Sequence, residues 1–251
     1  MIDKKLIDIR ESHKFDLVSL ENWLSKKLDD FSGFDKVKQF VGGQSNPTFV
    51  LTLKNSKEYV LRKKPPGHLL PSAHAIEREY KVQKALENSI IPCPKMYILC
   101  EDTKIIGTSF YLMERLDGEV YEDVLIPEIK KPSLRREIYL SMTRLLANLH
   151  MVSYKSIELE NLGKKDNYIR RQLDRWAKQW HLSKQRNIPE MESLIYWLSN
   201  NIPENDQTTL VHGDFRLGNL LFKKDSSKIN ALLDWELATL GHPLADLGYM
   251  L

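Results

Sequence analysis

Residues 210–222 of this 251-residue chain read Leu210-Val211-His212-Gly213-Asp214-Phe215-Arg216-Leu217-Gly218-Asn219-Leu220-Leu221-Phe222. Apolar residues flank the polar loop on both sides, so we expect its ends to be fixed while it presents Asp214 and Asn219. Fifteen residues after Asn219, Asp234 follows a second apolar run, residues 231–233. Carboxylate and amide oxygens suit Mg²⁺, which takes few protein ligands and shares its coordination sphere with phosphate and water. The pattern therefore predicts a magnesium–phosphate site formed by a loop and a strand end.

The spacing of these residues is more informative than any one of them. A single Asp or Asn in a loop is typically a turn-former or a helix cap. The joint pattern His-x-Asp-(x4)-Asn, with a later Asp after a hydrophobic run, matches the template for phosphoryl transfer, in which the loop Asp accepts a hydroxyl proton. A metal hydrolase built on Asp214 and Asp234 is a competing interpretation, which leaves the glycine turn, Arg62 and Glu79 without a role.

Six segments carry a family resemblance, three to a superfamily and three to a subgroup of it. The loop 212–219 resembles the catalytic loop of the aminoglycoside phosphotransferase and choline kinase-like superfamily. Leu233-Asp234-Trp235-Glu236 resembles its metal-binding segment, and residues 241–247 resemble the segment that follows. Residues 42–49, 59–71 and 106–114 are similar to a subgroup, the N-terminal kinase-like domain of acyl-CoA dehydrogenase family members 10 and 11. The resemblance extends from about residue 13 to the last residue.

The resemblance assigns roles to five residues of the C-terminal half. Asp214 would be the catalytic base, and Asn219 and Asp234 would bind Mg²⁺. His212 would hold the loop in shape through hydrogen bonds. Asp246 would be a structural carboxylate at the start of a helix, where capping of that helix is the simplest expectation.

A glycine-rich turn, Gly42-Gly43-Gln44-Ser45-Asn46, lies between the first two predicted strands. Glycine lets the backbone approach an anion closely, and N–H groups with the Ser45 hydroxyl could bind phosphate oxygens. An ordinary hairpin turn is the alternative interpretation. Because the superfamily closes a loop over nucleotide phosphates here, the resemblance makes Gly42, Gly43, Ser45 and Asn46 candidate nucleotide-binding residues.

A cation and an acidic partner are also expected in a kinase-like site. The resemblance places Arg62 at the position of the cation that binds the α- and β-phosphates, and Glu79 at the position of its partner. Most of the superfamily has Lys at the first position, but Arg can also bind phosphate with two hydrogen bonds. Strand alternation puts Lys64 on the same face as Arg62, so Lys64 is a second candidate. The main-chain atoms of Glu114 and Leu116, at the connection between the lobes, are candidates for binding adenine.

Periodicity along the chain predicts an α+β fold of two lobes. An amphipathic helix marked by Leu17 to Phe31 precedes strands at 37–41, 48–54 and 58–64, a helix from Ser72 to about residue 88, and strands at 96–100 and 109–114. After residues 115–119 helices dominate, at about 138–152, 168–182 and 189–200, with short strands at 210–211, 220–222 and 231–233. We therefore expect a protein-kinase-like fold, with an N-lobe (1–115) containing a five-stranded antiparallel sheet and a helical C-lobe (116–251). The resemblance implies that this C-lobe is incomplete at its C-terminus.

Composition limits the classes of function. Lys plus Arg number 37 against 34 Asp plus Glu, a formal charge of +3, which argues against a dedicated nucleic-acid binder. No apolar run is long enough for a membrane helix, and the N-terminus lacks a secretory signal pattern. Cys93 and Cys100 fit neither a disulfide framework nor a zinc site. We expect an intracellular, soluble protein, cytoplasmic by default, with peroxisomal or mitochondrial placement suggested by the resemblance.

The expected activity is transfer of the γ-phosphate of ATP to a substrate hydroxyl with Mg²⁺. The resemblance suggests a small-molecule acceptor such as a 4-hydroxyacyl-CoA, and an acyl-CoA dehydrogenase domain as a partner in the full-length gene. Two alternatives stay open: a nucleotide-binding regulatory module without catalysis, and an aminoglycoside- or choline-type phosphotransferase with another acceptor. The slightly positive overall charge disfavours a polycationic aminoglycoside.

Overall fold

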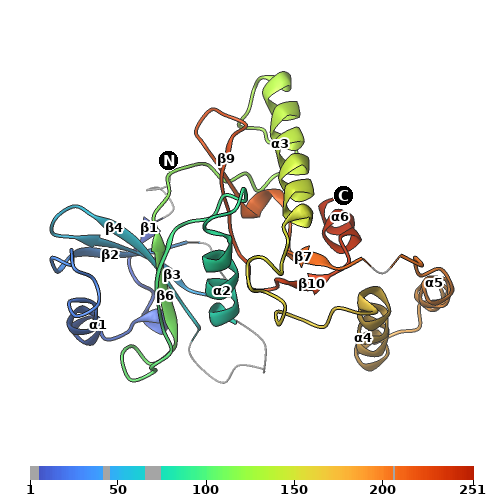
Figure 1. Cartoon of the computed structure of the whole chain (residues 1–251), viewed down its shortest axis with the longest axis horizontal. Helices are drawn as coiled ribbons and strands as arrows, with labels where there is room; N and C mark the ends of the chain where they lie inside the picture. The colour runs from blue at the N-terminus through green and yellow to red at the C-terminus, as the bar shows by residue number, and fades with distance from the viewer. Residues whose placement is uncertain (1–5, 42–45, 66–74, 206) are drawn as a thin grey trace.

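A computed structural model of the chain describes residues 6–41, 46–65, 75–205 and 207–251. Its N-terminal part is a six-stranded antiparallel sheet, and its C-terminal part is mainly helical (Figure 1). The strand order is β1-β2-β3-β4-β6-β5, with the bounds β1 Leu6–Ile7, β2 Phe34–Phe40, β3 Thr48–Leu53, β4 Glu58–Lys63, β6 Phe110–Glu114 and β5 Met96–Cys100.

Two helices cover the two faces of this sheet. Helix α1 (Leu17–Leu24) buries Leu20 and Leu24 against residues such as Phe49 and Leu61 on one face. Helix α2 (Ile76–Leu86) lies on the other face, where Ile76 packs with Tyr111 of β6. Because side chains alternate along a strand, Leu61 of β4 points to the α1 face and Arg62 points to the opposite face, toward α2.

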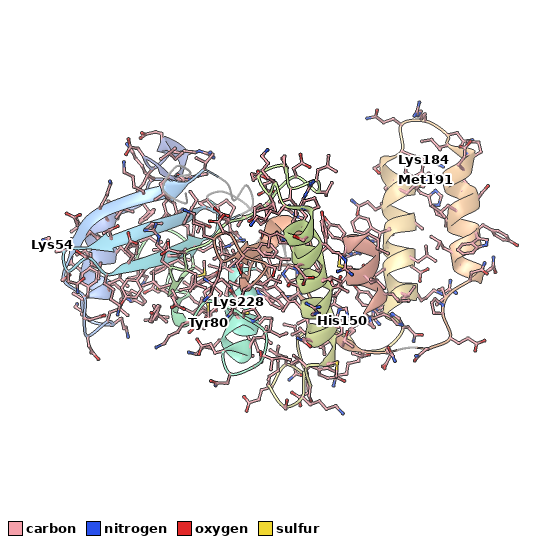
Figure 2. The ribbon with its side chains drawn as sticks, turned by 90° about the horizontal axis from the view of Figure 1, so that it is seen from above. Lys54, Tyr80, His150, Lys184, Met191 and Lys228 are labelled. Carbon is pink, nitrogen blue, oxygen red and sulfur yellow. The ribbon has the colours of Figure 1, made fainter. Side chains whose placement is uncertain are left out.

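The C-terminal part contains four helices and two small sheets among the described residues. The helices are α3 (Pro132–Met151), α4 (Tyr168–Ser183), α5 (Pro189–Asn200) and α6 (Leu244–Met250). Strand β7 (Thr209–Val211) pairs with β10 (Thr239–Gly241), and β8 (Leu220–Phe222) pairs with β9 (Ile229–Leu232). Helices α4 and α5 lie side by side at the end of the molecule away from the sheet, and neither has a fully buried side chain (Figures 1 and 2).

One apolar cluster joins the two parts. It contains Val82 and Leu86 of α2, Leu149 of α3, and Phe215 and Trp235 from the segments on either side of β8 and β9. The connection after β6 is also held to the C-terminal part, since Glu119 and Phe222 exchange backbone hydrogen bonds of 2.8 Å in each direction. The loop that carries the predicted catalytic residues is therefore anchored on both sides by core contacts.

The element boundaries differ from the sequence-based predictions in a few places. The sheet has six strands rather than five, because the two-residue strand β1 pairs with the edge of β2. Helix α1 ends at Leu24, although Leu28 and Phe31 still pack against the same cluster. Strand β10 was not predicted, and the proposed N-cap Ser72 lies outside the described residues. Across the described ranges, no helix combines the length and apolarity required to cross a membrane.

Candidate active site

The predicted catalytic loop folds back on itself, so that Asp214 and Asn219 are in direct contact. The side-chain nitrogen of Asn219 donates to the Asp214 carboxylate and to the Asp214 backbone carbonyl, both at 2.8 Å. A short 3-10 turn, η3 (Leu217–Asn219), reverses the chain and makes this possible. With its nitrogen used in this way, the amide oxygen of Asn219 stays available to a cation, and the residue is only 5% exposed.

The buried carboxylate of Asp246 holds the start of the loop. It accepts the backbone N–H groups of His212 and Gly213, both at 2.8 Å, and Nε2 of His150 on α3 lies 3.0 Å away (Figure 2). The expected helix-capping role is wrong: the N-cap of α6 is Pro243, with no side-chain cap bond, and Asp246 lies inside the first turn. Asp246 satisfies the donors of the catalytic loop rather than those of its own helix.

His212 is fully buried under the same loop. Its Nε2 lies 3.0 Å from the carbonyl of Leu233, and its Nδ1 accepts the backbone N–H of Asp214 at 3.2 Å. These bonds require a proton on Nε2 and none on Nδ1, which is the neutral form. Burial lowers the pKa of His212, although nearby carboxylates such as Asp246 oppose the shift. The ring thus joins the loop to the strand end before Asp234.

Gly213 occupies a backbone conformation that other residues rarely adopt. Its φ is +86°, and a Cβ there would lie 2.7 Å from the carbonyl oxygen of Leu237. Asp234, two residues after the end of β9, also has a positive φ, +67°. This unusual backbone turns the Asp234 side chain out of the strand direction, and 30% of the side chain is exposed.

The β8–β9 ladder brings Asp234 close to Asn219. Leu220 pairs with Leu232, and the backbone N–H of Leu233 donates to the carbonyl of Asn219 at 2.9 Å. Trp235, fully buried, donates from its indole nitrogen to the carbonyl of Leu232 at 2.9 Å and so fixes the turn after Asp234. The three predicted oxygen-bearing residues therefore converge, although they come from a loop and a separate strand end.

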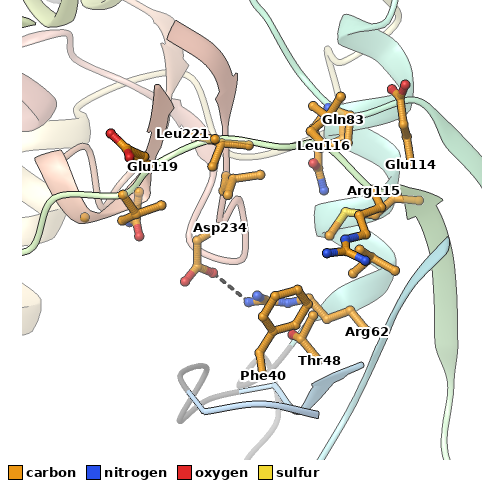
Figure 3. Close-up of a pocket in the computed structure, with 18 of the residues that line it drawn as sticks. Phe40, Thr48, Arg62, Gln83, Glu114, Arg115, Leu116, Glu119, Leu221 and Asp234 are labelled. Atoms are coloured by element: carbon orange, nitrogen blue, oxygen red, sulfur yellow. Dashed lines mark hydrogen bonds and ion pairs between the residues drawn. The ribbon is translucent and has the colours of Figure 1, made fainter. Parts of the chain in front are cut away.

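Arg62 joins the sheet to this cluster. One of its terminal nitrogens (Nη2) lies 2.7 Å from Asp234 (Figure 3). Its Nε lies 2.9 Å from the Glu79 carboxylate on α2. Burial disfavours the charge on Arg62, but Glu79 and the two carboxylates beyond it outweigh that cost and raise its pKa. Burial also raises the pKa of Glu79 to about 7, which Arg62 only partly counteracts. The predicted pair of Arg62 and Glu79 is thus present.

Glu236 is a site residue that the sequence reasoning missed. Its carboxylate accepts a 2.8 Å hydrogen bond from the side chain of Asn46 and lies 3.9 Å from Arg62. Glu236 could have been identified from the sequence, because it lies only two residues after Asp234, on the same turn. Of the glycine-rich turn, Asn46 is described and buried, while Gly42, Gly43 and Ser45 lie outside the described residues. Lys64, the second candidate cation, is paired with Glu77 at 2.6 Å instead.

Arg62, Glu79, Asn219 and Asp234 line a cavity of about 540 Å³, a size suited to a small ligand. Thr48 and Arg62 face it from the sheet, and Asp234 faces it from the C-terminal part (Figure 3). Val60 and Asn219 also line it. Lining residues at the end of β6 and just after it include Met113, Glu114 and Leu116. The N–H of Glu114 already donates to the carbonyl of Lys95 at 2.8 Å, so adenine would have to use other main-chain atoms there.

The donor set fits Mg²⁺. Within the described parts of the chain, no three His, Cys, Asp or Glu side chains gather as a metal cage. A magnesium ion held by the Asn219 amide oxygen and the Asp234 carboxylate would complete its sphere with phosphate oxygens and water, which is the usual arrangement for this ion. One oxygen of the Asp234 carboxylate, Oδ1, is engaged by Arg62.

The fold has a kinase-like architecture, and the family to which the chain belongs is one of phosphotransferases. The chain belongs to the phosphotransferase enzyme family, whose sequence profile matches residues 36–251. It is 44% identical over 252 residues to human acyl-CoA dehydrogenase family member 11, covering 98% of this chain and 32% of that protein. It is 47% identical over 232 residues to mouse acyl-CoA dehydrogenase family member 10, covering 92% of this chain and 22% of that protein. The chain thus spans a third or less of these relatives.

Solved structures share the fold. A candidate aminoglycoside phosphotransferase from Ralstonia eutropha JMP134 superposes with a TM-score of 0.84 at 45% identity, covering 94% of this chain and 69% of that one. A thermostable mutant of aminoglycoside phosphotransferase APH(4)-Ia, in complex with ADP and hygromycin B, superposes with a TM-score of 0.65 at 16% identity, covering 92% and 75%. The family resemblance and the kinase-like fold expected from the sequence are confirmed.

Proposed function

We propose that this protein transfers the γ-phosphoryl group of ATP to a hydroxyl of a small molecule, with the nucleotide bound in the cavity between the sheet and the helical part. The observation that carries this proposal is that Asn219 and Asp234 line a cavity together with Arg62, while the Asp214 carboxylate is hydrogen-bonded to Asn219. Phosphoryl transfer needs mainly positioning and charge neutralisation, and these residues provide both.

Asp214 is the proposed general base. Its carboxylate, oriented by Asn219, would accept the proton of the acceptor hydroxyl as the acceptor oxygen bonds to the γ-phosphorus and the bond to the β–γ bridging oxygen breaks. Arg62 would bind the α- and β-phosphates by exchanging its contact with Asp234 for contacts with phosphate oxygens. Its Nε would remain next to the Glu79 carboxylate. Mg²⁺, when bound at Asn219 and Asp234, would offset the negative charge of the phosphates.

The acceptor is the least constrained part of the proposal. The names of the relatives, acyl-CoA dehydrogenase family members, make a 4-hydroxyacyl-CoA the first acceptor to test and an acyl-CoA dehydrogenase the first partner to consider. The cavity lining carries six acidic residues against three arginines, despite the net positive charge of the chain. The overall charge therefore does not argue against a cationic acceptor at this site, and aminoglycosides and choline belong in the same panel.

The decisive substitution is Asp214→Asn. We expect turnover, measured as ADP release with the responding acceptor, to fall at least 10³-fold, because the general base is lost. Binding of Mg-ATP, measured by thermal shift, should stay within about twofold of the parent value, since Asp214 holds no metal or phosphate in this scheme. Asp174→Asn, on the exposed surface of α4, is the matched control and should change neither quantity. Undiminished turnover by the Asp214 variant would refute the assignment.

A nucleotide-binding module without catalysis is the second candidate. The observation in its favour is the 2.7 Å contact between Arg62 and Asp234, since it places a fixed cation on a proposed metal ligand. The two candidates differ in a simple outcome. Nucleotide binding that persists with no ADP release from any acceptor in the panel would favour the regulatory module, whereas acceptor-dependent ADP release would favour the kinase.

A further inference from the structure

Arg216, two residues after Asp214, has no role in the scheme above. Its Nε lies 3.4 Å from the Asp214 carboxylate, and a terminal nitrogen lies 3.4 Å from Glu122. Charge-assisted hydrogen bonds are usually 2.7–2.9 Å long, and the hydrogen bond from Arg62 to Asp234 has such a length, 2.7 Å. Arg216 is therefore held loosely. Its side chain is 44% exposed, against 11% for Arg62, so it can exchange its partners at small cost.

The charges around the cavity favour a cation at this position. The segment after the lobe connection contributes Glu119, Glu122 and Glu128 to the lining. A polyphosphate entering beside these carboxylates would be repelled unless a cation lay near them. Among the arginines of the lining, Arg62 contacts Asp234, and Arg216 contacts Asp214 on the other side of Asn219. The two guanidinium groups thus flank the carboxylates of the proposed base and the proposed metal ligand.

The loop leaves room for this guanidinium through Gly218. A Cβ at position 218 would lie 2.3 Å from a terminal nitrogen of Arg216 and 2.7 Å from the Glu122 carboxylate. Both atoms are the ends of flexible side chains, so a methyl group here would displace the Arg216 head rather than prevent folding. Gly218 also lines the cavity, directly before Asn219. The sequence Arg216-Leu217-Gly218-Asn219 therefore supplies both the cation and the space for it.

We propose that Arg216 is a catalytic residue that binds the γ-phosphoryl group of ATP, leaving Asp214 and Glu122 when the nucleotide enters. This inference rests on the proposed kinase function and adds a second cation to it. A guanidinium can bind two phosphate oxygens at once and stays charged at any physiological pH. Its release from Asp214 frees that carboxylate for the acceptor hydroxyl at the moment the γ-phosphoryl group is in place. Charge that develops on the transferred group would be stabilised where it forms.

The test compares ATP with ADP, because the two differ in the γ-phosphoryl group. In Arg216→Gln, the dissociation constant for Mg-ATP, measured by calorimetry, should rise about tenfold while that for Mg-ADP changes less than twofold. The turnover number should fall by about 10²- to 10³-fold. Arg216→Lys should recover part of the ATP affinity, and Gly218→Ala, which keeps the arginine but displaces it, should reproduce the ATP-specific loss in weaker form. Arg144→Gln, an exposed arginine on α3, is the matched control.

Each other outcome has a defined meaning. If Arg216→Gln binds ATP and ADP as the parent protein does, or loses both equally, Arg216 does not bind the γ-phosphoryl group and the inference is overturned. If the parent protein binds neither nucleotide, the proposed function fails first. Circular dichroism and the melting temperature of each variant separate loss of the fold from loss of the contact, and Gly218→Ala gives an independent reading should Arg216→Gln unfold.

Discussion

Glu79 shows how strongly the surroundings of one residue can change its chemistry. It is fully buried on α2, beside the guanidinium of Arg62 and near Asp234 and Glu236. Burial outweighs the attraction of Arg62 and raises the pKa of Glu79 to about 7, from an ordinary value of 4.5. Between those two pH values the folded protein binds this proton more tightly than the unfolded chain does. The resulting stability is present at low pH and is lost as the pH rises through 7.

Glu79→Gln should remove this pH dependence. We expect the free energy of unfolding of the parent, relative to that of the variant, to decrease by about 2 kcal/mol between pH 5 and pH 8, measured by urea denaturation. Glu77→Gln is the control on the same helix. Burial raises the pKa of Glu77, but the hydrogen bond and charge of Lys64, together with hydrogen bonds from the Glu77 backbone and Ser109, outweigh burial and lower the net pKa. The free energy of unfolding of the parent, relative to that of Glu77→Gln, should therefore stay constant between pH 5 and pH 8. It should change only in more acidic solution. If the free energy of unfolding of the parent relative to Glu79→Gln also stayed constant over this pH range, the prediction would be contradicted.

At the scale of elements, the hydrophobic periodicity predicted most of the secondary structure. The strands 96–100 and 220–222 and the helix 189–200 have the predicted bounds, since their apolar runs end at prolines or polar turns. Strands β1 and β10 escaped prediction because two or three residues carry no periodic pattern. They are strands only because a partner, β2 or β7, offers backbone hydrogen bonds.

Helix α3 supports the catalytic loop through its buried face. Leu149 is fully buried in the cluster that contains Phe215 and Trp235, whereas Met151, two residues later, is 81% exposed. Leu149→Ala should lower the free energy of unfolding by about 2 to 5 kcal/mol, because it leaves a cavity in the core. Met151→Ala should change it by less than about 0.5 kcal/mol. Equal effects of the two substitutions in urea denaturation would show that α3 does not pack as described.

At the scale of the whole molecule, nucleotide binding should stabilise both lobes together, because the proposed ligands of the phosphates and of Mg²⁺ come from both. At a Mg-ATP concentration 100 times the dissociation constant, we expect about 2.7 kcal/mol of stabilisation. For a chain of this length that corresponds to a rise of about 5 to 10 °C in the melting temperature. Chelating the magnesium should remove much of the rise.

Asp234→Asn identifies the site of that magnesium effect. The variant weakens a proposed metal ligand, so its melting temperature with ATP should no longer depend on whether magnesium or a chelator is present. Asp225→Asn, on the β8–β9 turn, serves as the matched control and should behave as the parent does. Magnesium dependence that survives in the Asp234 variant would place the metal elsewhere.

The sequence by itself determined the local chemistry of this protein. Asp214 and Asn219 are five positions apart in a loop bounded by apolar runs, so their contact follows from short-range geometry, and the family spacing extended the set to Asp234, Arg62 and Glu79. The tertiary structure alone decided the contacts between distant segments. Arg62 and Asp234 are 172 positions apart, and Asp246 serves the catalytic loop rather than its own helix. Such pairings depend on how β4, β9 and α6 pack around a common core, which no local pattern of residues encodes.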